Sequence, residues 1–424
     1  MTHKVDTLII GGGPSGLGAA IALQNQGKLL EQSPEIGGFS GSIELAGAVM
    51  DYGGHSFHTP HASVKKLVFD SLDMYEQERN AQCFHSGQFI PYPFQQNFRH
   101  LTSENVIDEC EVGLRTLPQQ KAKNFKEHIE NSFGSGISKH FMLPYNQKLW
   151  GADLTRLSAE WTGERVAAAY KGTKSNMSNG KRKPLQARST VAYPSRGGFI
   201  EIFKALARPL KTIEFGASVE RIDVNKRILW TSEGSSYTYE KLISTIPITK
   251  LLPLLTFRET QLTDSVAKLQ ALGLYLVFVV VEGKVNTPIQ RIYNAESHIL
   301  AHKTVINHNS SDYLRAKSRH GIVAEISDAK PLDTSSPTLE RKVISNLIEM
   351  GIIRSASQVV KTHRTYVPFG YPVPSHTRDE IIQAVKDWLR PFDIYTVGRF
   401  GEWAYINSDE ALFKGLKLGS ELKR

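Results

Sequence analysis

Apolar and polar positions divide the chain into three kinds of segment. Near the N-terminus, VDTLIIGGGPSGLGAAIALQNQG is typical of a buried strand, a glycine turn and a helix that ends near Gly27. Residues 64–190 have helical periodicity, most clearly in SVKKLVFDSLDMYEQE, SENVIDECEVGLRTL and NFKEHIENSFGSGISKHFMLPYNQKLW. Residues 254–374 alternate as strands do, in LGLYLVFVVVEG, KTVINHN and HGIVAEIS. The pattern predicts an α/β protein with one inserted helical part and one inserted part made of strands.

The first glycine turn has the spacing of a dinucleotide site. Gly11, Gly13 and Gly16 form a GxGxxG pattern between the predicted strand and helix. The first glycine allows the tight turn, the second lets a pyrophosphate approach the backbone, and the third lets the helix pack on the strand. The helix N-terminus then faces the phosphates. Glu31 follows about 20 residues after Gly11, where an acid bonds a ribose hydroxyl in such sites.

Later segments favour FAD over NAD. The stretch EQSPEIGGFSGS places a second glycine pair after Glu31, in an order that resembles the FAD fingerprint of amine-oxidase-like and glutathione-reductase-like flavoproteins. GASVERIDVNKRILW resembles the strand of these folds that meets the adenine near Val219, and KLISTIPITKLL resembles the strand that returns to the sheet. We therefore expect a discontinuous Rossmann-like FAD domain (1–63, 191–253 and 375–424). A helical domain (64–190, with a mobile loop at about 166–190) and an antiparallel sheet domain (254–374) are inserted into it.

The composition says more about the kind of ligand that the protein binds than about its fold. A chain of 424 residues suggests two or three domains, and its net charge of +9 suggests an anionic ligand. No nucleic-acid-binding pattern accompanies this charge, so an anionic small molecule is the simpler interpretation. Two cysteines without metal or disulfide spacing, no signal-peptide pattern and no apolar run that spans a bilayer lead us to expect a cytoplasmic protein without a metal site or membrane insertion. The basic segment KGTKSNMSNGKRKP is either a solvated loop or a lid over an anion.

The stretch IPYPFQQN (90–97) is stiffened by two prolines, which disfavour both a helix interior and a central strand. We expect an extended segment that presents Tyr92 and Gln95 to a ligand. The alternative is an extended segment that packs two domains together.

Seven motifs in this order resemble UDP-galactopyranose mutase, closer to its eukaryotic-type branch than to the common bacterial one. They are GGHSFHTPH (53–61), SGQFIPYPFQQN (86–97), FGSGISKHFMLPYNQKLWG (133–151), AEWTGERVA (159–167), YPSRGG (193–198), FGYPVP (369–374) and GRFGEWAY (398–405). The resemblance extends over nearly the whole chain. It implies a mutase that isomerises a nucleotide-linked sugar, with reduced FAD as the active form. The source of electrons, NAD(P)H or another reductant, stays open.

In that family the N5 atom of the reduced flavin attacks the anomeric carbon and expels UDP, so the cofactor acts as a nucleophile rather than a net redox agent. The resemblance assigns catalytic roles to Arg165, His55 and His302. It assigns substrate binding to Tyr92, Gln95, Trp150, Arg165, Tyr293, Tyr371 and Tyr405. It assigns cofactor binding to Gly11, Gly13, Pro14, Ser15, Gly16, Glu31, Gly38, Phe39, Ser40, His55, Val219, Gly398, Arg399 and Asn407.

The chain departs from the family at the diphosphate. The mutases use two arginines, of which Arg165 matches one, but ILAHKTVINHN places His302 at the second position. Lys303 is adjacent and would point to the opposite face of a strand. A neutral histidine is a weaker anion partner. The asparagine of the other mobile loop is also absent, with Arg188 near its place. These changes leave the sugar and the nucleotide open.

Two other functions stay open at this point. One is an FAD-dependent oxidase or dehydrogenase on the amine-oxidase-like scaffold, which would need an apolar or amine-lined cavity rather than phosphate donors. The other is a flavin-binding relative without catalytic activity, for which the missing second arginine is the only argument. The oligomeric state does not follow from the sequence.

Overall fold

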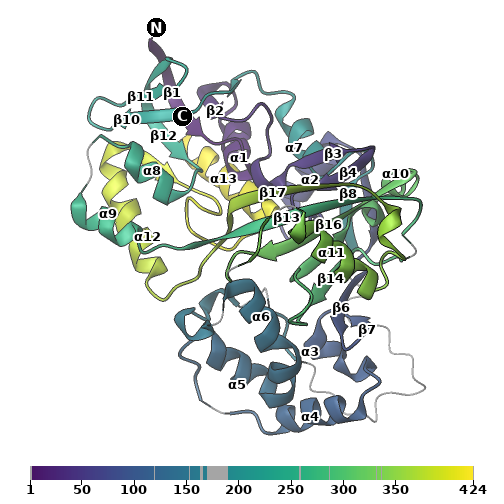
Figure 1. Cartoon of the computed structure of the whole chain (residues 1–424). Coiled ribbons are helices and arrows are strands. Elements are labelled where there is room, and N and C mark those ends of the chain that lie inside the picture. Colours follow the sequence, from purple (N-terminus) through teal and green to yellow (C-terminus); the bar gives the residue numbers. More distant parts are fainter. Residues whose placement is uncertain are drawn as a thin grey trace.

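The computed structural model describes residues 2–118, 120–151, 153–162, 166–169, 190–256, 259–285, 287–330, 332–335 and 337–423. In this part of the chain, two seven-stranded sheets lie beside a separate group of helices (Figure 1). No helix in the described ranges combines the length and the apolar character that a bilayer crossing requires.

The first sheet is assembled from separated parts of the chain. Its order is β10 (Val219–Asp223), β11 (Ile228–Thr231), β12 (Ser236–Ser244), β1 (Thr2–Ile10), β2 (Gly27–Glu31) and β9 (Ile213–Phe215), and β18 (Ile394–Thr396) also pairs with β12. Strands β12, β1, β2 and β9 are parallel, whereas β10, β11 and β12 are antiparallel neighbours. The parallel core confirms the predicted Rossmann-like sheet.

Both faces of this sheet are covered. Leu8 and Ile10 belong to one buried cluster and Ile9 to another, because successive strand residues point to opposite faces. The first cluster includes residues of α8 (Ile248–Leu254), α9 (Thr260–Val266) and α12 (Arg378–Leu389), and the second includes residues of α1 (Pro14–Leu23), α2 (Ala62–Ser71), α7 (Ile200–Ala207) and α13 (Ser408–Leu422). Helices α1 and α13 pack closely, since a Cβ at Gly415 would lie 1.9 Å from the Ser15 carbonyl oxygen.

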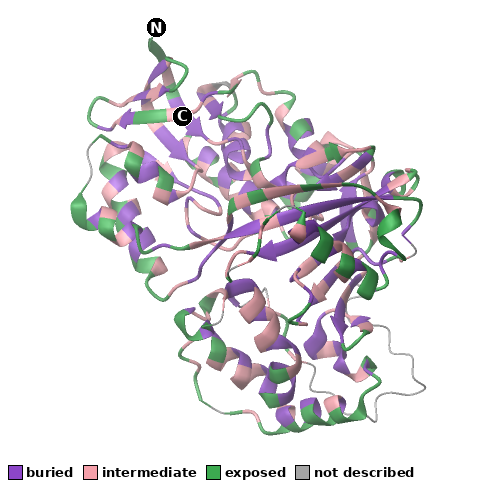
Figure 2. Ribbon diagram, in the orientation of Figure 1, coloured by how far each residue is buried: buried purple, intermediate pink, exposed green. Residues whose placement is uncertain are grey.

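The second sheet has the order β17 (Val359–Pro372), β13 (Ala271–Glu282), β16 (Arg319–Ser327), β15 (Lys303–Ile306), β14 (Arg291–Asn294), β6 (Ala81–His85) and β7 (Gln88–Pro91). All neighbours are antiparallel except β14 and β6, which are parallel. Strand β13 is buried along most of its length (Figure 2), as its apolar run predicts. Helices α10 (Asp312–Arg315) and α11 (Thr338–Glu349) follow β15 and β16 in the chain.

Two parts of the segment expected to be helical are strands. Met74–Glu78 is β5, which pairs with β8 (Thr190–Pro194), and β6 and β7 form a hairpin that extends the second sheet. Ser86 and Gly87 have φ values of 48° and 77°, as a tight two-residue hairpin turn requires. The expectation of helix for 74–78 was wrong. The apolar residues of the longer segment SVKKLVFDSLDMYEQE have helical spacing, and the five residues of β5, none of them buried, are too few to show a strand pattern of their own. The domain boundaries stay a prediction.

The helices of this segment are α3 (Phe94–Asn97), α4 (Glu104–Arg115), α5 (Phe125–Ile137) and α6 (Leu143–Trp150), with a π-helical turn at Ser138–Met142. The expectation of an extended stretch at 90–97 holds only to Pro93, because α3 begins directly after it. Proline at the residue before a helix leaves the helical hydrogen bonds intact, so the second proline starts the helix instead of preventing it.

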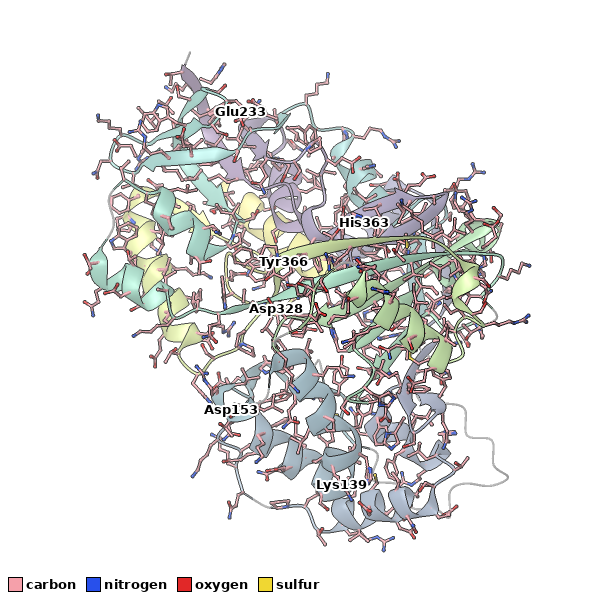
Figure 3. All side chains as sticks on the ribbon, viewed as in Figure 1. Lys139, Asp153, Glu233, Asp328, His363 and Tyr366 are labelled. Atoms are coloured by element: carbon pink, nitrogen blue, oxygen red, sulfur yellow. The ribbon has the colours of Figure 1, made fainter. Side chains whose placement is uncertain are left out.

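An irregular pairing of β13 and β17 shapes the edge of the second sheet. Leu272 pairs with Tyr371, but Leu274 pairs with Val367, so β17 carries extra residues between these pairs. Gly273 lies at this irregularity, and a Cβ there would meet the Tyr366 hydroxyl at 2.3 Å. That hydroxyl donates to Asp328 Oδ2 at 2.7 Å, beside the sheet (Figure 3). The extra residues of β17 reach the cavity described next.

A further hairpin, β3 (Ser42–Leu45) and β4 (Ala48–Asp51), lies between the two sheets in the chain order and contacts β16. Asp51 at its end is buried and accepts hydrogen bonds from Ser42 Oγ, the Tyr193 hydroxyl and the backbone N–H of Phe199. Burial raises the pKa of Asp51, although these three donors oppose the shift. The hairpin thereby holds the chain that leads into His55.

Candidate functional site

A cavity of about 500 Å³ lies at the carboxyl ends of three parallel strands. Residues that follow β1 (Gly11 and Gly13), β2 (Gln32 and Ser33) and β12 (Thr245–Pro247) line it. Ligands of open α/β sheets bind at this edge. The cavity is therefore the candidate cofactor site.

Most of the predicted cofactor residues line this cavity. Those that do are Gly11, Gly13, Pro14, Ser15, Glu31, Gly38, Phe39, Ser40, His55, Arg399 and Asn407. Gly16, Val219 and Gly398 are not among the lining residues: a Cβ at Gly16 would lie 1.8 Å from the Gly11 carbonyl oxygen, and one at Gly398 would lie 2.4 Å from Ser15 Oγ. Those two glycines permit close packing behind the cavity wall. Val219 begins β10.

The residues present fit a dinucleotide. Gly13 has room for the phosphates, because nothing lies within 4 Å of the position of a Cβ there. The carboxylate of Glu31 accepts from the Gly12 N–H at 2.5 Å and from the Ser33 N–H at 2.8 Å, and its side chain also lines the cavity. The acid predicted to bond a ribose thus also stabilises the glycine turn. Sequence reasoning did not identify the wall from β17, which includes Thr365, Val367, Pro368 and Phe369.

His55 stands at the junction of this cavity with the second sheet. Its ring stacks on Phe199 with 4.9 Å between centroids, and its Nδ1 is buried without a hydrogen-bond partner in the described part of the chain. Burial, followed by the charges of Lys303, Arg291 and Arg399, lowers the pKa of His55 to about 3. The imidazole is therefore neutral at physiological pH, and His55 lines the cofactor cavity.

This low pKa predicts how acid affects stability. Between pH 6.5 and about pH 3 the unfolded chain binds a proton at residue 55 that the folded chain does not, so stability falls as pH falls through this window. The loss is about 1.4 kcal/mol for each pH unit below 6.5. We expect His55→Gln to have a shallower fall in Tm between pH 7 and pH 4.5 than the wild type.

The exposed His363 on β17 provides the control (Figure 3). His363→Gln should keep the wild-type dependence of Tm on pH. Identical pH dependence in the wild type and His55→Gln would contradict a neutral, buried His55.

Aromatic side chains continue the site beyond His55. The Tyr371 and Tyr405 rings lie 5.3 Å apart, and Trp150 lies 5.8 Å from each. The guanidinium of Arg399 is 5.1 Å from both tyrosine rings and also lines the cofactor cavity. Trp161 joins the group at 5.4 Å from Trp150 and 5.6 Å from Tyr405. Sequence reasoning missed Trp161, although it lies in the motif that supplied Arg165.

The other predicted substrate residues make internal contacts. Tyr92 stacks on Tyr293 at 4.2 Å, Arg79 donates to the Tyr293 hydroxyl at 3.2 Å, and Gln95 Nε2 donates to the Ala167 carbonyl oxygen at 2.8 Å. Tyr92 also lines a cavity of about 510 Å³ together with Arg79 and Gln82, so these contacts leave open the expected presentation of Tyr92 and Gln95 to a ligand. The role of Tyr92 and Gln95 in binding a base stays a prediction.

Positive charge collects around Tyr293. Burial alone would raise the pKa of its phenol, but Arg79, Arg291 and Lys303 together bring the pKa below its ordinary value. Local sequence patterns do not group these cations, because the pairing of β14 with β15 and with β6, which follows Arg79, brings them together.

His302 and Lys303 converge, contrary to the expectation of opposite faces. Lys303 Nζ lies 2.8 Å from Glu325 Oε2, and His302 Nε2 lies 3.8 Å from the same oxygen. Strand β15 begins only at Lys303, so strand alternation does not separate the two side chains. Arg165 and Arg188 lie outside the described residues.

The comparisons with known proteins agree with this geometry. The family model described as flavin containing amine oxidoreductase matches residues 14–363. The crystal structure of reduced UDP-galactopyranose mutase is 25% identical and has a TM-score of 0.89, over 98% of this chain and 93% of that chain. The resemblance that the seven motifs predict is thereby confirmed.

Two more distant structures share the fold alone. Wild-type putrescine oxidase bound to putrescine is 15% identical with a TM-score of 0.68, over 99% of each chain. The CLA-producing fatty acid isomerase from P. acnes is 14% identical with a TM-score of 0.68, over 98% of each chain.

Proposed function

The chain belongs to the flavin containing amine oxidoreductase family, and we propose that within this family it is a flavin-dependent mutase. It interconverts the pyranose and furanose forms of a sugar linked to a nucleoside diphosphate, with UDP-galactose as the first candidate. The observation that carries the proposal is the location of Arg399. This residue lines the cofactor cavity, and its guanidinium lies over the rings of both Tyr371 and Tyr405. The groups proposed to bind the diphosphate thus lie beside the wall of the cofactor cavity.

Gly13, Glu31 and Arg399 line the cavity that would hold a reduced flavin, which would supply the electron pair for displacement at the anomeric carbon without net oxidation. The chain's own residues bind and orient the leaving diphosphate. Burial raises the pKa of Tyr371 well above its ordinary value, so its phenol keeps its proton and can donate a hydrogen bond to a phosphate oxygen. His55 stays neutral and lines the cofactor cavity. Donors fixed before the reaction stabilise charge as it develops on the diphosphate.

The proposal is tested by a product assay under anaerobic conditions. Purified, flavin-loaded protein is reduced with dithionite and incubated with UDP-galactopyranose, UDP-galactofuranose and a panel of other nucleotide sugars. Chromatography should show a new isomer of one nucleotide sugar at the expense of the starting compound. The panel identifies the sugar and the base. No isomer from any member of the panel would contradict the mutase.

The alternative is an FAD-dependent oxidase or dehydrogenase. The same preparation, oxidised and in air, is incubated with primary amines and polyamines while oxygen uptake is followed. Arg79, Arg291, Lys303 and Arg399 give the site a positive field, which disfavours an ammonium substrate. We therefore expect no amine-dependent oxygen uptake, and bleaching of the oxidised flavin by an amine would favour the oxidase.

A further inference from the structure

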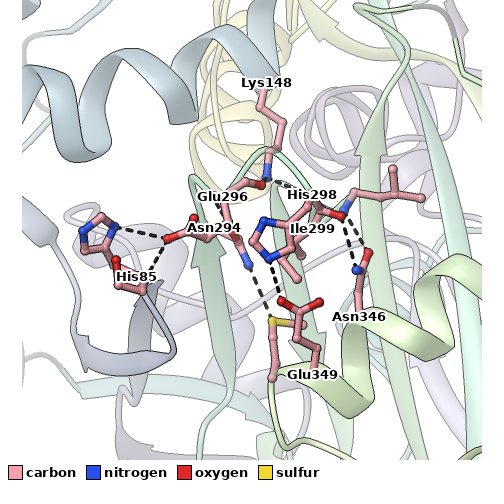
Figure 4. Close-up of polar contacts among 11 residues, drawn as sticks. His85, Lys148, Asn294, Glu296, His298, Ile299, Asn346 and Glu349 are labelled. Atoms are coloured by element: carbon pink, nitrogen blue, oxygen red, sulfur yellow. Dashed lines mark hydrogen bonds and ion pairs between the residues drawn. The ribbon is translucent and has the colours of Figure 1, made fainter.

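Lys148 joins helix α6 to the second sheet. Its Nζ donates to the carbonyl oxygens of Glu296 and Ile299, at 2.5 and 2.7 Å, in the turn between β14 and β15 (Figure 4). One side chain thus bridges two backbone acceptors of the turn. It fixes the turn and the helix to each other.

The turn is also held from its other side. Asn346 of α11 accepts from the Leu300 N–H at 3.0 Å and donates to the His298 carbonyl oxygen at 3.3 Å. The carboxylate of Glu296 accepts from the Ser86 N–H, in the β6–β7 hairpin, at 2.8 Å. The turn is therefore anchored to the second sheet, and the lysine contact attaches α6 to it.

Helix α6 carries part of the candidate site on both sides of Lys148. The Trp150 ring lies 5.8 Å from that of Tyr371, and the Tyr145 ring lies 6.1 Å from that of Tyr293. Tyr371 and Tyr293 belong to β17 and β14 of the second sheet. A displacement of α6 relative to this sheet therefore changes the spacing of the aromatic side chains in the candidate site.

Ser327 makes a second attachment of the same helix. Its hydroxyl, at the end of β16, donates to the Leu149 carbonyl oxygen at 2.7 Å. A serine hydroxyl does not titrate in the pH range of enzyme assays, whereas a buried lysine can. The two attachments are therefore expected to respond differently to pH.

The surroundings of Lys148 place its titration near neutral pH. Burial, opposed by the charge of Glu296 and aided by that of Lys330, lowers the pKa of Lys148 to about 7. A hydrogen bond from His85 lowers the pKa of Glu296 to about 2. Burial, followed by the charges of Lys303 and Lys148, lowers the pKa of His302 well below its ordinary value.

Between pH 6 and pH 8.5, Glu296 therefore stays an anion and His302 stays neutral, while Lys148 changes from an ammonium to an amine. Hydrogen bonds donated by an ionised group are roughly twice as strong as those between neutral groups. The attachment of α6 to the turn should therefore weaken as the pH rises through about 7.

We propose that Lys148 is a positioning residue of the proposed mutase, which fixes α6 and its Trp150 against the second sheet and loosens them when it loses its proton. The proposal rests on the proposed function, because it names a residue that acts on the substrate site without touching the substrate. The attachment itself belongs to the fold and is measured without substrate.

Hydrogen exchange of the wild type measures the attachment and needs no variant. Flavin-loaded protein is exchanged at pH 6 and at pH 8.5, and the rates are corrected for the intrinsic effect of pH. The protection of residues 143–151 and 295–302 should be about fivefold lower at pH 8.5, whereas α13 should keep its protection. Equal protection of α6 and the turn at both pH values would overturn the proposal.

Steady-state kinetics measure the consequence for the reaction. At pH 6, Lys148→Met should raise KM for the nucleotide sugar about tenfold and change kcat by less than about threefold, because a displaced aromatic wall weakens binding of substrate and transition state alike. At pH 8.5 the ratio of its KM to that of the wild type should fall to about threefold or less, since the wild type has then lost its ammonium.

Two variants provide the controls. Ser327→Ala removes a contact of the same helix that does not titrate, so the ratio of its KM to that of the wild type should be equal at both pH values. Lys139→Met removes an ammonium that lies 2.7 Å from Glu109 Oε2, between the π-helical turn and α4 (Figure 3). It should leave kcat and KM at their wild-type values.

Two kinetic results would contradict the proposal alone. A KM ratio for Lys148→Met that is the same at pH 6 and pH 8.5 would reduce Lys148 to a packing residue. The same pH dependence in Ser327→Ala would assign the titration to another group. If the reduced wild type isomerises no nucleotide sugar, the proposed function fails and the positioning role fails with it, whereas a pH-dependent protection of α6 would stand.

Discussion

Gly16→Ala is expected to yield a destabilised protein without bound flavin. A Cβ at Gly16 would lie 1.8 Å from the Gly11 carbonyl oxygen, inside the turn that joins β1 to α1. No flexible side chain is involved, so strand and helix must separate, and we expect a cost of roughly 4 kcal/mol or more. The measurements are the flavin-to-protein ratio from absorbance and the Tm of protein freed of flavin.

Gly13→Ala separates cofactor binding from folding. Gly13 has φ −70° and ψ 179°, which alanine adopts readily, and nothing in the protein lies within 4 Å of the added Cβ. The Tm of the flavin-free protein should therefore stay within a few degrees of the wild type, while flavin affinity falls at least about tenfold because the Cβ enters the space for the phosphates. Wild-type flavin affinity in Gly13→Ala would contradict the placement of the pyrophosphate at this turn.

Arg399→Met is expected to lower kcat/KM for the nucleotide sugar by about 100-fold or more, which corresponds to about 2.7 kcal/mol. The guanidinium donates to the Gly370 carbonyl oxygen at 2.8 Å and to the Ile406 carbonyl oxygen at 3.3 Å. These residues adjoin Tyr371 and Tyr405, so Arg399 fixes both tyrosines as well as the charge at the cofactor cavity. Arg399→Lys should recover little, since one ammonium cannot replace the planar fork.

Arg378 provides the matched control for Arg399. Its Nη1 donates to the carbonyl oxygen of Trp403, in the same segment, at 3.1 Å, but it does not line the cavity. Arg378→Met should leave kcat/KM within about twofold of the wild type. Wild-type kcat/KM in Arg399→Lys would show that a positive charge at residue 399 is sufficient. It would contradict the proposed role of the guanidinium in fixing Tyr371 and Tyr405.

The parts of the fold with strong local signals could be predicted from the sequence. The β1–α1 turn and the apolar strand β13 could be predicted because their signals, the glycine spacing and a continuous apolar run, each lie within a short stretch of sequence. Strand β5 could not be predicted, because its partner β8 lies more than 100 residues away and none of its five residues is buried. Pairing between distant segments, rather than local propensity, decides such strands.

The candidate site likewise contains residues that the sequence could predict and residues that it could not. Residues within motifs, such as His55, Arg399 and Tyr371, could be selected from the sequence because each motif is contiguous. The meeting of Lys303 with Glu325 depends on the pairing of β15 with β16, which sets these residues directly opposite each other. Strand alternation predicted opposite faces for the side chains of His302 and Lys303. That prediction failed because β15 begins only at Lys303, so His302 lies outside the strand. Register and strand boundaries are tertiary properties that a single sequence does not contain.

The most direct test of the mutase compares one preparation in two redox states. Anaerobic, flavin-loaded protein, either oxidised or reduced with dithionite, is mixed with the nucleotide sugar identified by the panel. Product and flavin absorbance are followed together. A mutase forms many equivalents of isomer only when reduced, and its flavin absorbance is unchanged at the end of the reaction. Isomer formation at equal rates by oxidised protein, or one equivalent of product accompanied by a permanent change of flavin redox state, would contradict it.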